Sequence, residues 1–386
     1  MINLHIISTS RADFGIQKEL IKNIQKDKRF KSKFVISGSH LSKNYGYSVN
    51  EIDLEKIKID KKIKIKCGAS NLLDTISDIN EINKSYSKFI LENKPDLIMV
   101  FGDRYEMLPF ALTGYLNNIP IAHIHGGEIT KGSLDDGIRN AITKLANIHF
   151  VSNQTHKKRV IQMGEEKNKV INIGYLSYET LRKTKLISKN VLEKKLDIIF
   201  EDNLIIINLY SETSKRKKIY IKFCKHLVKF LKQQKNTTLI FTKPGSDIDN
   251  LKIYNFFFDK LKKTKNCFFF KTLGSKNYLS LLNFSNIMIG NSSSGIYDMP
   301  FFFKPSINIG DRQLGREKFY SVIDVDYNIN NFKKKFRQAM SPTFLKRIKV
   351  KNEIKEPKVE PSKKIINFLV KTKFEKLNPK NFFDIQ

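Results

Sequence analysis

The sequence contains no tryptophan, and its 386 residues include only three cysteines. Cys67, Cys224 and Cys267 are odd in number and far apart, which favours reduced thiols and a cytoplasmic location over a disulfide framework. These cysteines and the seven histidines show no metal-ligand spacing. We therefore expect no metal site.

Long apolar runs are also missing. The longest have the length of a strand, far below the roughly 18 to 20 residues that a membrane span needs. Residues 1–8 have no basic segment and no cleavage site, so they predict no signal peptide. We expect no membrane partner.

Acidic residues are scarce relative to basic ones: 38 Asp and Glu against 70 Lys and Arg give a net charge of +32. Such a charge can indicate binding to nucleic acid or to an anionic membrane surface. The lysines are scattered through every segment, however, and no RNA- or DNA-binding motif accompanies them. With the many Asn, Ile and Phe residues, this composition fits a coding bias toward AT-rich codons. We expect no nucleic-acid partner, and electrostatic steering of an anionic substrate.

The length of the chain suggests two domains rather than one core. Strand-length apolar runs alternate with helical patterns, which predicts an α/β fold with doubly wound parallel sheets. We expect one Rossmann-like domain at 1–175 and a second at 176–386, with the last helix, at 362–369, packing back on the first domain. Short helices are predicted at 141–146 and 296–299, and a polar stretch between 341 and about 361.

Charged side chains gather where two predicted strands of the first half end. The strands are expected at 97–101 and 119–124, and open α/β sheets bind ligands at the carboxyl ends of their strands. The charged residues that follow them are Asp103, Arg104, Glu128, Asp135, Asp136 and Arg139. A merely structural segment would not need so many charges at strand ends, so this pattern favours a functional site.

The second half contains a serine-rich turn, Gly290 to Gly295, between a predicted strand and a predicted helix. Hydroxyl groups and the first N–H groups of a helix can bind a phosphate there, and the helix dipole favours negative charge. Serine also acts as a plain helix cap, but three consecutive serines between glycines exceed that need. Asp298 is placed to accept hydrogen bonds from sugar hydroxyls, and Arg312 adds positive charge. A weaker anion site of the same kind is expected at Arg11.

Eight segments in this order resemble the hydrolysing UDP-N-acetylglucosamine 2-epimerases, over about residues 1–325. They are STSRADFG, GSHLSKNYG, FGDRYE, HIHGGE, SLDDGIRNAITKLA, FTKPGSD, GNSSSGIYDMP and INIGDRQLGRE. The resemblance implies a GT-B-like fold, with two doubly wound Rossmann-like domains and a central cleft, and no cofactor. Because members are often dimers or tetramers, it also implies a homo-oligomer.

The activity implied by the resemblance is hydrolysis of the nucleotide sugar UDP-N-acetylglucosamine to N-acetylmannosamine and UDP, for the synthesis of nonulosonic (sialic-type) acids. The nucleotide leaves by anti elimination to a glycal, and water then adds with inversion at C2. In a sister branch the substrate is UDP- or GDP-2,4-diacetamido-2,4,6-trideoxyglucose, for legionaminic acid.

The same resemblance implies roles for particular residues. Carboxylates serve as acids and bases near C1 and C2, and donors stabilise the departing diphosphate. The implied catalytic residues are Asp103, Glu128 and Asp135, with Asp136 and Arg139 orienting them. The implied substrate-binding residues are Arg11, His40, Arg104, Asp247, Tyr278, Ser292, Ser293, Asp298 and Arg312. Of these, Tyr278 would stack on the base, Asp298 would bind the ribose and His40 would lie in the sugar pocket, although without that context His40 is better explained as a loop histidine.

The chain departs from the family pattern in its second half. Tyr210 replaces the usual histidine, Asp298 replaces a glutamate and Gly245 replaces an asparagine, while the charged segment 349–362 replaces a glycine-rich turn. Tyr210 carries no positive charge near pH 7. We therefore expect unchanged chemistry with an altered nucleotide or sugar specificity.

Two other classes of function remain open. A GT-B glycosyltransferase shares the fold and the phosphate turn, but the acid set of Asp103, Glu128 and Asp135 argues against it. A catalytically inactive nucleotide-sugar binder is favoured only by the changes at Tyr210 and Asp298.

Overall fold

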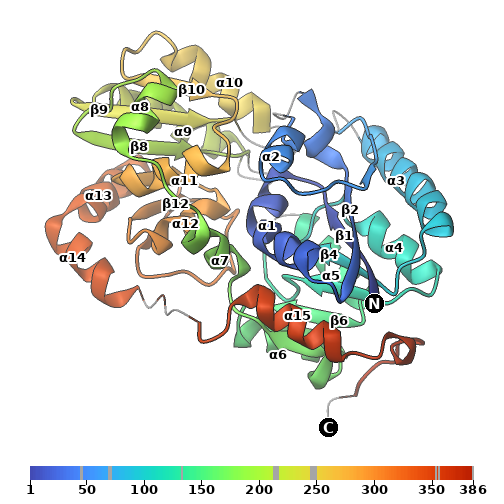
Figure 1. Cartoon of the computed structure of the whole chain (residues 1–386). Coiled ribbons are helices and arrows are strands. Elements are labelled where there is room, and N and C mark those ends of the chain that lie inside the picture. Colours follow the sequence, from blue (N-terminus) through green and yellow to red (C-terminus); the bar gives the residue numbers. More distant parts are fainter. Residues whose placement is uncertain are drawn as a thin grey trace. The chain divides into compact units, whose positions relative to one another are not determined.

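The computed structural model describes residues 1–43, 47–67, 72–131, 134–211, 217–243, 250–352, 354 and 357–384. The chain folds into two compact units (Figure 1). The first unit comprises Met1–Glu128, Leu134–Arg182 and Glu356–Gln386, and the second comprises Ile129–Ser133 and Lys183–Lys355. The expected boundary after 175 is seven residues too early, because the helix that follows it packs into the first unit. Leu176 in that helix is fully buried in the first core, and Thr180 donates a hydrogen bond to the carbonyl of Ile16.

The first unit is built on a seven-stranded parallel sheet with the order β3-β2-β1-β4-β5-β6-β7. Its strands are β1 (Ile2–Ser8), β2 (Phe30–Ile36), β3 (Lys61–Lys62), β4 (Leu97–Phe101), β5 (Ile121–Ile124), β6 (Ile148–Val151) and β7 (Val170–Asn172). The helices are α1 (Arg11–Lys26), α2 (Val49–Leu54), α3 (Leu72–Glu92), α4 (Leu108–Leu116), α5 (Leu134–Leu145), α6 (Gln154–Gln162), α7 (Leu176–Lys183) and α15 (Pro361–Lys371). Every residue of β4 and β5 is buried, as in a parallel sheet covered on both faces.

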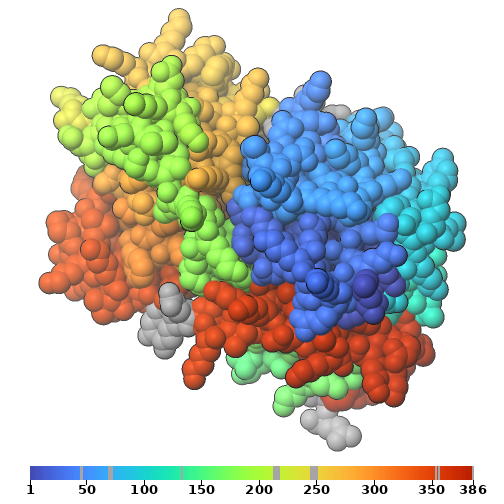
Figure 2. Space-filling model, in the orientation of Figure 1, coloured from blue at the N-terminus to red at the C-terminus, as the bar shows by residue number. Residues whose placement is uncertain are grey.

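The C-terminal segment packs on this first unit. Ile365 and Leu369 of α15 are fully buried in the first core, and α15 contacts α1. Beyond the helix, the Lys380 ammonium donates to the carbonyl of Lys144 at the end of α5 (2.8 Å) and to the Glu165 carboxylate (2.9 Å). In Figure 2 this segment is the red region at the bottom, lying against blue and green parts of the same unit.

The second unit is built on a six-stranded parallel sheet with the order β10-β9-β8-β11-β12-β13. Its strands are β8 (Asn203–Asn208), β9 (Thr237–Thr242), β10 (Cys267–Phe270), β11 (Ile287–Gly290), β12 (Ser306–Ile309) and β13 (Val322–Val325). The helices are α8 (Lys189–Leu196), α9 (Lys217–Lys232), α10 (Asn250–Leu261), α11 (Ser275–Phe284), α12 (Ser293–Phe301), α13 (Ile329–Met340) and α14 (Pro342–Lys351). With both sheets parallel and doubly wound, the predicted fold class is confirmed.

Three elements differ from those predicted. α14 lies within the stretch predicted to be polar. The Ser341 hydroxyl caps it, and Phe344 and Ile348 are buried on one face. The sequence did not show this face because lysines and arginines separate its apolar residues. α5 begins at Leu134 rather than at 141, and α12 spans Ser293–Phe301 rather than 296–299. In both cases the first turn is made mostly of small or acidic residues, which show no apolar periodicity.

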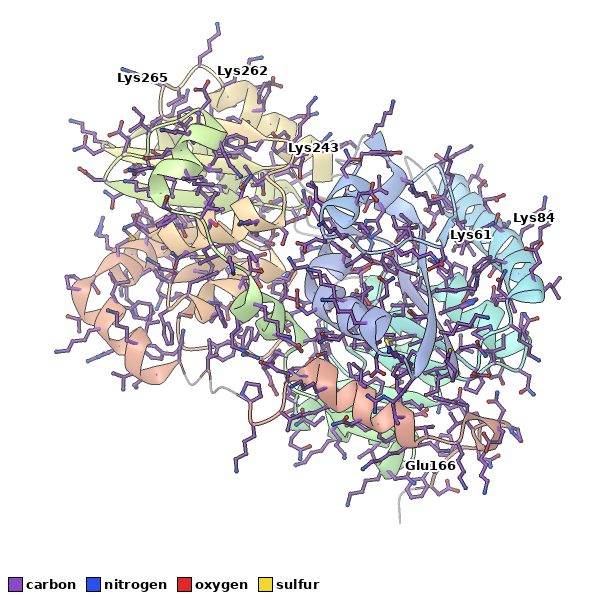
Figure 3. All side chains as sticks on the ribbon, viewed as in Figure 1. Lys61, Lys84, Glu166, Lys243, Lys262 and Lys265 are labelled. Carbon is purple, nitrogen blue, oxygen red and sulfur yellow. The ribbon has the colours of Figure 1, made fainter. Side chains whose placement is uncertain are left out.

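The positive charge is spread over the exposed faces of both units. Figure 3 shows Lys84 projecting from α3, and Lys262 and Lys265 projecting from the end of α10 and the turn after it. All three side chains are exposed. Among the helices that the structure describes, none is long and apolar enough to cross a membrane.

We predict that Gly290→Ala lowers the free energy of unfolding by about 3 kcal/mol, the upper range for overpacking a core. A Cβ at Gly290, where β11 passes β8, would lie 2.0 Å from the carbonyl oxygen of Asn208. Gly295→Ala is the matched control, because its Cβ would meet nothing closer than the Met288 sulfur at 3.4 Å. Urea unfolding measures both variants, and equal midpoints would contradict the prediction.

Candidate active site

In each sheet the strand order reverses beside the unit's first strand. β1 lies between β2 and β4, and β8 lies between β9 and β11. At such switch points the connections leave in opposite directions, and ligands bind outside the carboxyl ends of the strands. The loops after β1, β4 and β5 carry predicted site residues in the first unit, and the loop after β11 carries them in the second.

Arg139 connects several predicted catalytic groups of the first unit. Its side chain is 1% exposed. Its Nη2 donates to the Asp103 carboxylate, and its Nη1 donates to Asp136 (3.2 Å) and to the backbone carbonyl of Glu128 (2.9 Å). A buried guanidinium needs such partners to offset its lost hydration. The arginine thereby fixes the loop after β4, the loop after β5 and the start of α5 against one another.

Asp135 and Asp136 lie in the first turn of α5 and are half-buried. Carboxylates at this end of a helix are stabilised by its dipole. The helix predicted from the sequence began only at 141, after both of them. The structure therefore gives them a rigid backbone, with Arg139 one turn further along.

Glu128 is brought to the same region by β5. It is 7% exposed, and its Oε1 lies 3.1 Å from Nδ1 of His125. The turn between these residues requires glycine, because a Cβ at Gly127 (φ +77°) would lie 2.5 Å from the carbonyl oxygen of His156. His125 was not among the predicted site residues, although the motif HIHGGE places it three residues before Glu128.

His123, on β5, supports the neighbouring loop. Its Nε2 lies 2.8 Å from the carbonyl oxygen of Gly102, and its Nδ1 lies 3.1 Å from the Thr143 hydroxyl. Burial lowers its pKa to about 3. The imidazole is therefore neutral near pH 7 and fixes the turn that precedes Asp103.

His40 and Arg104, both predicted to contact substrate, are engaged within the protein. His40 is fully buried, with Nε2 2.9 Å from the Ser8 hydroxyl and Nδ1 2.8 Å from the Ser48 hydroxyl, and burial lowers its pKa to about 3. Arg104 donates two hydrogen bonds to the buried carboxylate of Glu106 (3.1 and 3.0 Å). These contacts position the loops after β1 and β4, and the substrate contacts of both residues stay predictions.

Arg11 is the first residue of α1 and is half-buried. The helix is capped by the Ser10 hydroxyl, which accepts a hydrogen bond from the backbone N–H of Asp13 (3.2 Å). This places Arg11 directly beside the β1–β4 switch point, where the sequence predicted a weak anion site.

Asn291 organises the predicted phosphate turn of the second unit. Its side-chain oxygen accepts from the backbone N–H of Tyr210 (2.7 Å), and its amide nitrogen donates to the Tyr210 carbonyl (3.2 Å). Its own carbonyl accepts from Arg312 (3.3 Å) and from Gln313 (2.8 Å). One neutral residue thus joins the end of β8, the serine-rich turn and the loop after β12 through its side chain and its backbone carbonyl.

The serine-rich turn forms the N-terminus of α12. The Ser292 hydroxyl accepts from the backbone N–H of Ser294 (3.3 Å), and Ser293 is exposed at the first helical position. One turn on, Asp298 accepts a hydrogen bond from the Ser294 hydroxyl (2.7 Å). Burial raises the pKa of Asp298 to about 6, and this hydrogen bond opposes the shift.

Tyr210 and Tyr278 lie near the end of β8. The Arg312 guanidinium stacks over the Tyr210 ring, 4.6 Å from its centroid. The Tyr278 hydroxyl accepts from the side chain of Asn208 (2.9 Å), the last residue of β8. Asp247 and Gly245 lie outside the described residues.

Comparison with known proteins agrees with this picture. The family model described as UDP-N-acetylglucosamine 2-epimerase matches residues 22–369. A GDP/UDP-N,N′-diacetylbacillosamine 2-epimerase (hydrolyzing) of Campylobacter jejuni is 37% identical over 98% of each chain. A UDP-N-acetylglucosamine 2-epimerase of Neisseria meningitidis is 28% identical, over 87% of this chain and 86% of that one. The crystal structure of a Neisseria meningitidis UDP-GlcNAc 2-epimerase bound to UDP-GlcNAc has a TM-score of 0.81 at 19% identity, covering 96% of this chain and all of that one.

The two doubly wound units therefore have the GT-B-like fold of nucleotide-sugar enzymes. The chain belongs to the UDP-N-acetylglucosamine 2-epimerase family, and within it to the hydrolysing 2-epimerases. The predicted family is confirmed.

We predict that Arg139→Met lowers the free energy of unfolding by about 3 to 5 kcal/mol, the cost of removing one partner from a buried ionic cluster. The substitution leaves the carboxylates of Asp103 and Asp136 without their shared cation. Arg29→Met is the control, because Arg29 pairs with Asp27 on the surface and is 54% exposed. Urea unfolding should show a large shift in midpoint for the first variant and none for the second. Equal midpoints would reject the central role of Arg139.

Proposed function

We propose that this chain hydrolyses a nucleotide-linked 2,4-diacetamido-2,4,6-trideoxyglucose, the sugar also called N,N′-diacetylbacillosamine, and inverts it at C2. The observation that carries this proposal is the 37% identity over 98% of both chains to a GDP/UDP-N,N′-diacetylbacillosamine 2-epimerase. The sequence motifs alone favour UDP-N-acetylglucosamine as the substrate. The whole-length relative reverses that preference and leaves the reaction type unchanged.

The carboxylates of the first unit would carry the chemistry. Glu128 accepts the proton from C2 while the C1–O bond breaks, so that the electron pair of the C–H bond becomes the C1–C2 double bond and the nucleoside diphosphate leaves with the C1–O pair. Water then adds its oxygen to C1, and a proton returns to C2 from the opposite face. Asp103 and Asp135 serve these later proton transfers, and Arg139 and Asp136 hold them in place.

The second unit would hold the nucleotide. Ser292, Ser293 and the N-terminus of α12 donate to the diphosphate, where a helix dipole favours negative charge. Arg312 adds a permanent positive charge, Asp298 binds the ribose hydroxyls and Tyr278 stacks on the base. Arg11 of the first unit is a further diphosphate contact. The product would enter nonulosonic-acid synthesis in the cytoplasm.

A second candidate substrate is UDP-N-acetylglucosamine, which would give N-acetylmannosamine. It is favoured by the 28% identity to a UDP-N-acetylglucosamine 2-epimerase over 87% of this chain. The two substrates share the reacting carbons C1 and C2 and differ at C4 and C6. The same acids serve both.

We predict that the protein in deuterated water converts UDP- or GDP-N,N′-diacetylbacillosamine into the free 2-epimer deuterated at C2, together with the nucleoside diphosphate. Deuterium enters because the proton returned to C2 comes from solvent. Proton NMR follows the reaction, with UDP-N-acetylglucosamine in a parallel sample. Glu128→Gln should abolish turnover, whereas Glu166→Gln should not, because Glu166 lies in the turn before β7 and pairs with Lys169. Product without deuterium would reject the elimination mechanism, and absence of product from all three substrates would reject the proposed function.

We also predict that the ring of Tyr210, and not its hydroxyl, matters for nucleotide binding. The aromatic face orients the Arg312 guanidinium by a cation–π contact. Tyr210→Phe should bind UDP as the parent protein does, whereas Tyr210→Leu should bind roughly two- to fivefold more weakly, as expected for losing ~0.5–1 kcal/mol. Isothermal titration calorimetry measures both. Weaker binding by the phenylalanine variant would instead assign a direct contact to the hydroxyl.

A further inference from the structure

We infer that His125 is a positioning residue for Glu128: its imidazole N–H holds the Glu128 carboxylate in the orientation that accepts a proton. The inference rests on the proposed function and adds to it a residue outside the set of acids and arginines that the sequence indicated.

The backbone presents His125 at the end of β5 in an unusual conformation. Its φ is +68°, a left-handed value that is uncommon for residues other than glycine and is favoured by Asn, Asp and His. The ring packs against Phe101, the last residue of β4, with centroids 4.7 Å apart. The left-handed backbone turns the ring toward Glu128, and the Phe101 contact keeps it there.

The hydrogen-bond pattern selects one tautomer. Nδ1 of His125 lies 3.1 Å from Oε1 of Glu128. Nε2 is buried, and it has no hydrogen-bond partner among the described residues. A carboxylate only accepts hydrogen bonds, so Nδ1 must carry the hydrogen in a neutral ring. The other tautomer would set two acceptors against each other and bury a donor without an acceptor, which is costly.

Glu128 is consequently held at both ends. Its backbone carbonyl accepts from the buried guanidinium of Arg139, and its carboxylate oxygen Oε1 lies 3.1 Å from Nδ1 of His125. A donor on one oxygen stabilises the ionised form and fixes the plane of the carboxylate. Proton abstraction at carbon depends strongly on such alignment, because a misplaced base loses most of the advantage of proximity.

Two isosteric substitutions separate this role from simple packing. Asn and Asp have the same shape, and both tolerate a left-handed backbone. His125→Asn retains an N–H donor near the position of Nδ1, whereas His125→Asp replaces that donor with a second carboxylate beside Glu128. If His125 only fills space, the two variants behave alike.

We expect His125→Asn to keep kcat within about tenfold of the parent protein and His125→Asp to lose about 100-fold or more, the low end of what a positioned base contributes. KM should change little in either, because the nucleotide-binding residues lie on other elements. Thermal melting checks that both variants are folded. Equal kcat values for the two folded variants, whether high or low, would overturn the inference.

A spectroscopic measurement tests the same pair without turnover. In protein labelled with ¹⁵N-histidine, Glu128→Gln should shift the His125 ring nitrogen signals, because a neutral amide replaces the charged acceptor, while the matched change Asp135→Asn should leave them in place. Unshifted signals in Glu128→Gln would overturn the inference even if the enzyme is active. Shifted signals in a protein that turns over none of the nucleotide sugars would support the pair and reject the proposed function alone.

Discussion

A single buried guanidinium determines the geometry of the candidate active site in the first unit. Arg139 lies on α5 but bonds to the loop after β4, to the loop after β5 and to the first turn of its own helix. Removing a charge from water costs several kcal/mol, and only the full set of partners offsets that cost. The three segments must therefore adopt their native arrangement together. The contacts that offset the cost of burying the Arg139 charge also place Asp103, Asp136 and Glu128 near one another.

In the second unit a neutral amide holds the loops of the candidate site together. Asn291 joins Tyr210, Arg312 and Gln313 through its side chain and its carbonyl. An amide both donates and accepts, so it ties two chain segments without adding a charge. This suits an anion site, because Asn291 itself adds no negative charge beside the positive end of α12 and the guanidinium of Arg312. The organising residue is thus a cation among carboxylates in the first unit, and a neutral amide beside the proposed diphosphate site in the second.

The sequence predicted the parts of this site that depend on local pattern. The runs predicted as strands at 97–101 and 119–124 contain β4 (Leu97–Phe101) and β5 (Ile121–Ile124), and the acids that follow them lie where parallel strands end. It could not predict which polar side chains pair with each other, because those contacts depend on how the loops fold in three dimensions. Arg104 and His40 have the residue types of ligand contacts but bond to Glu106 and to two serines. His125 was overlooked for the opposite reason, since only its left-handed backbone and its distance to Glu128 distinguish it from other buried histidines.

The energetics of the acid cluster argue against a binder without catalytic activity. A buried ionic cluster is commonly no more stable than apolar side chains of the same volume, so stability alone gives no reason to keep Arg139 with two carboxylates. The departures at Tyr210 and Asp298 do not remove the groups proposed to bind a nucleotide: Arg312 stacks on the Tyr210 ring and remains permanently charged, and Asp298 is still a carboxyl group in the second turn of α12. A chain that only bound nucleotide sugars would need the second unit's groups but not a costly cluster at the strand ends of the first. Proton transfer at carbon is the function that requires both.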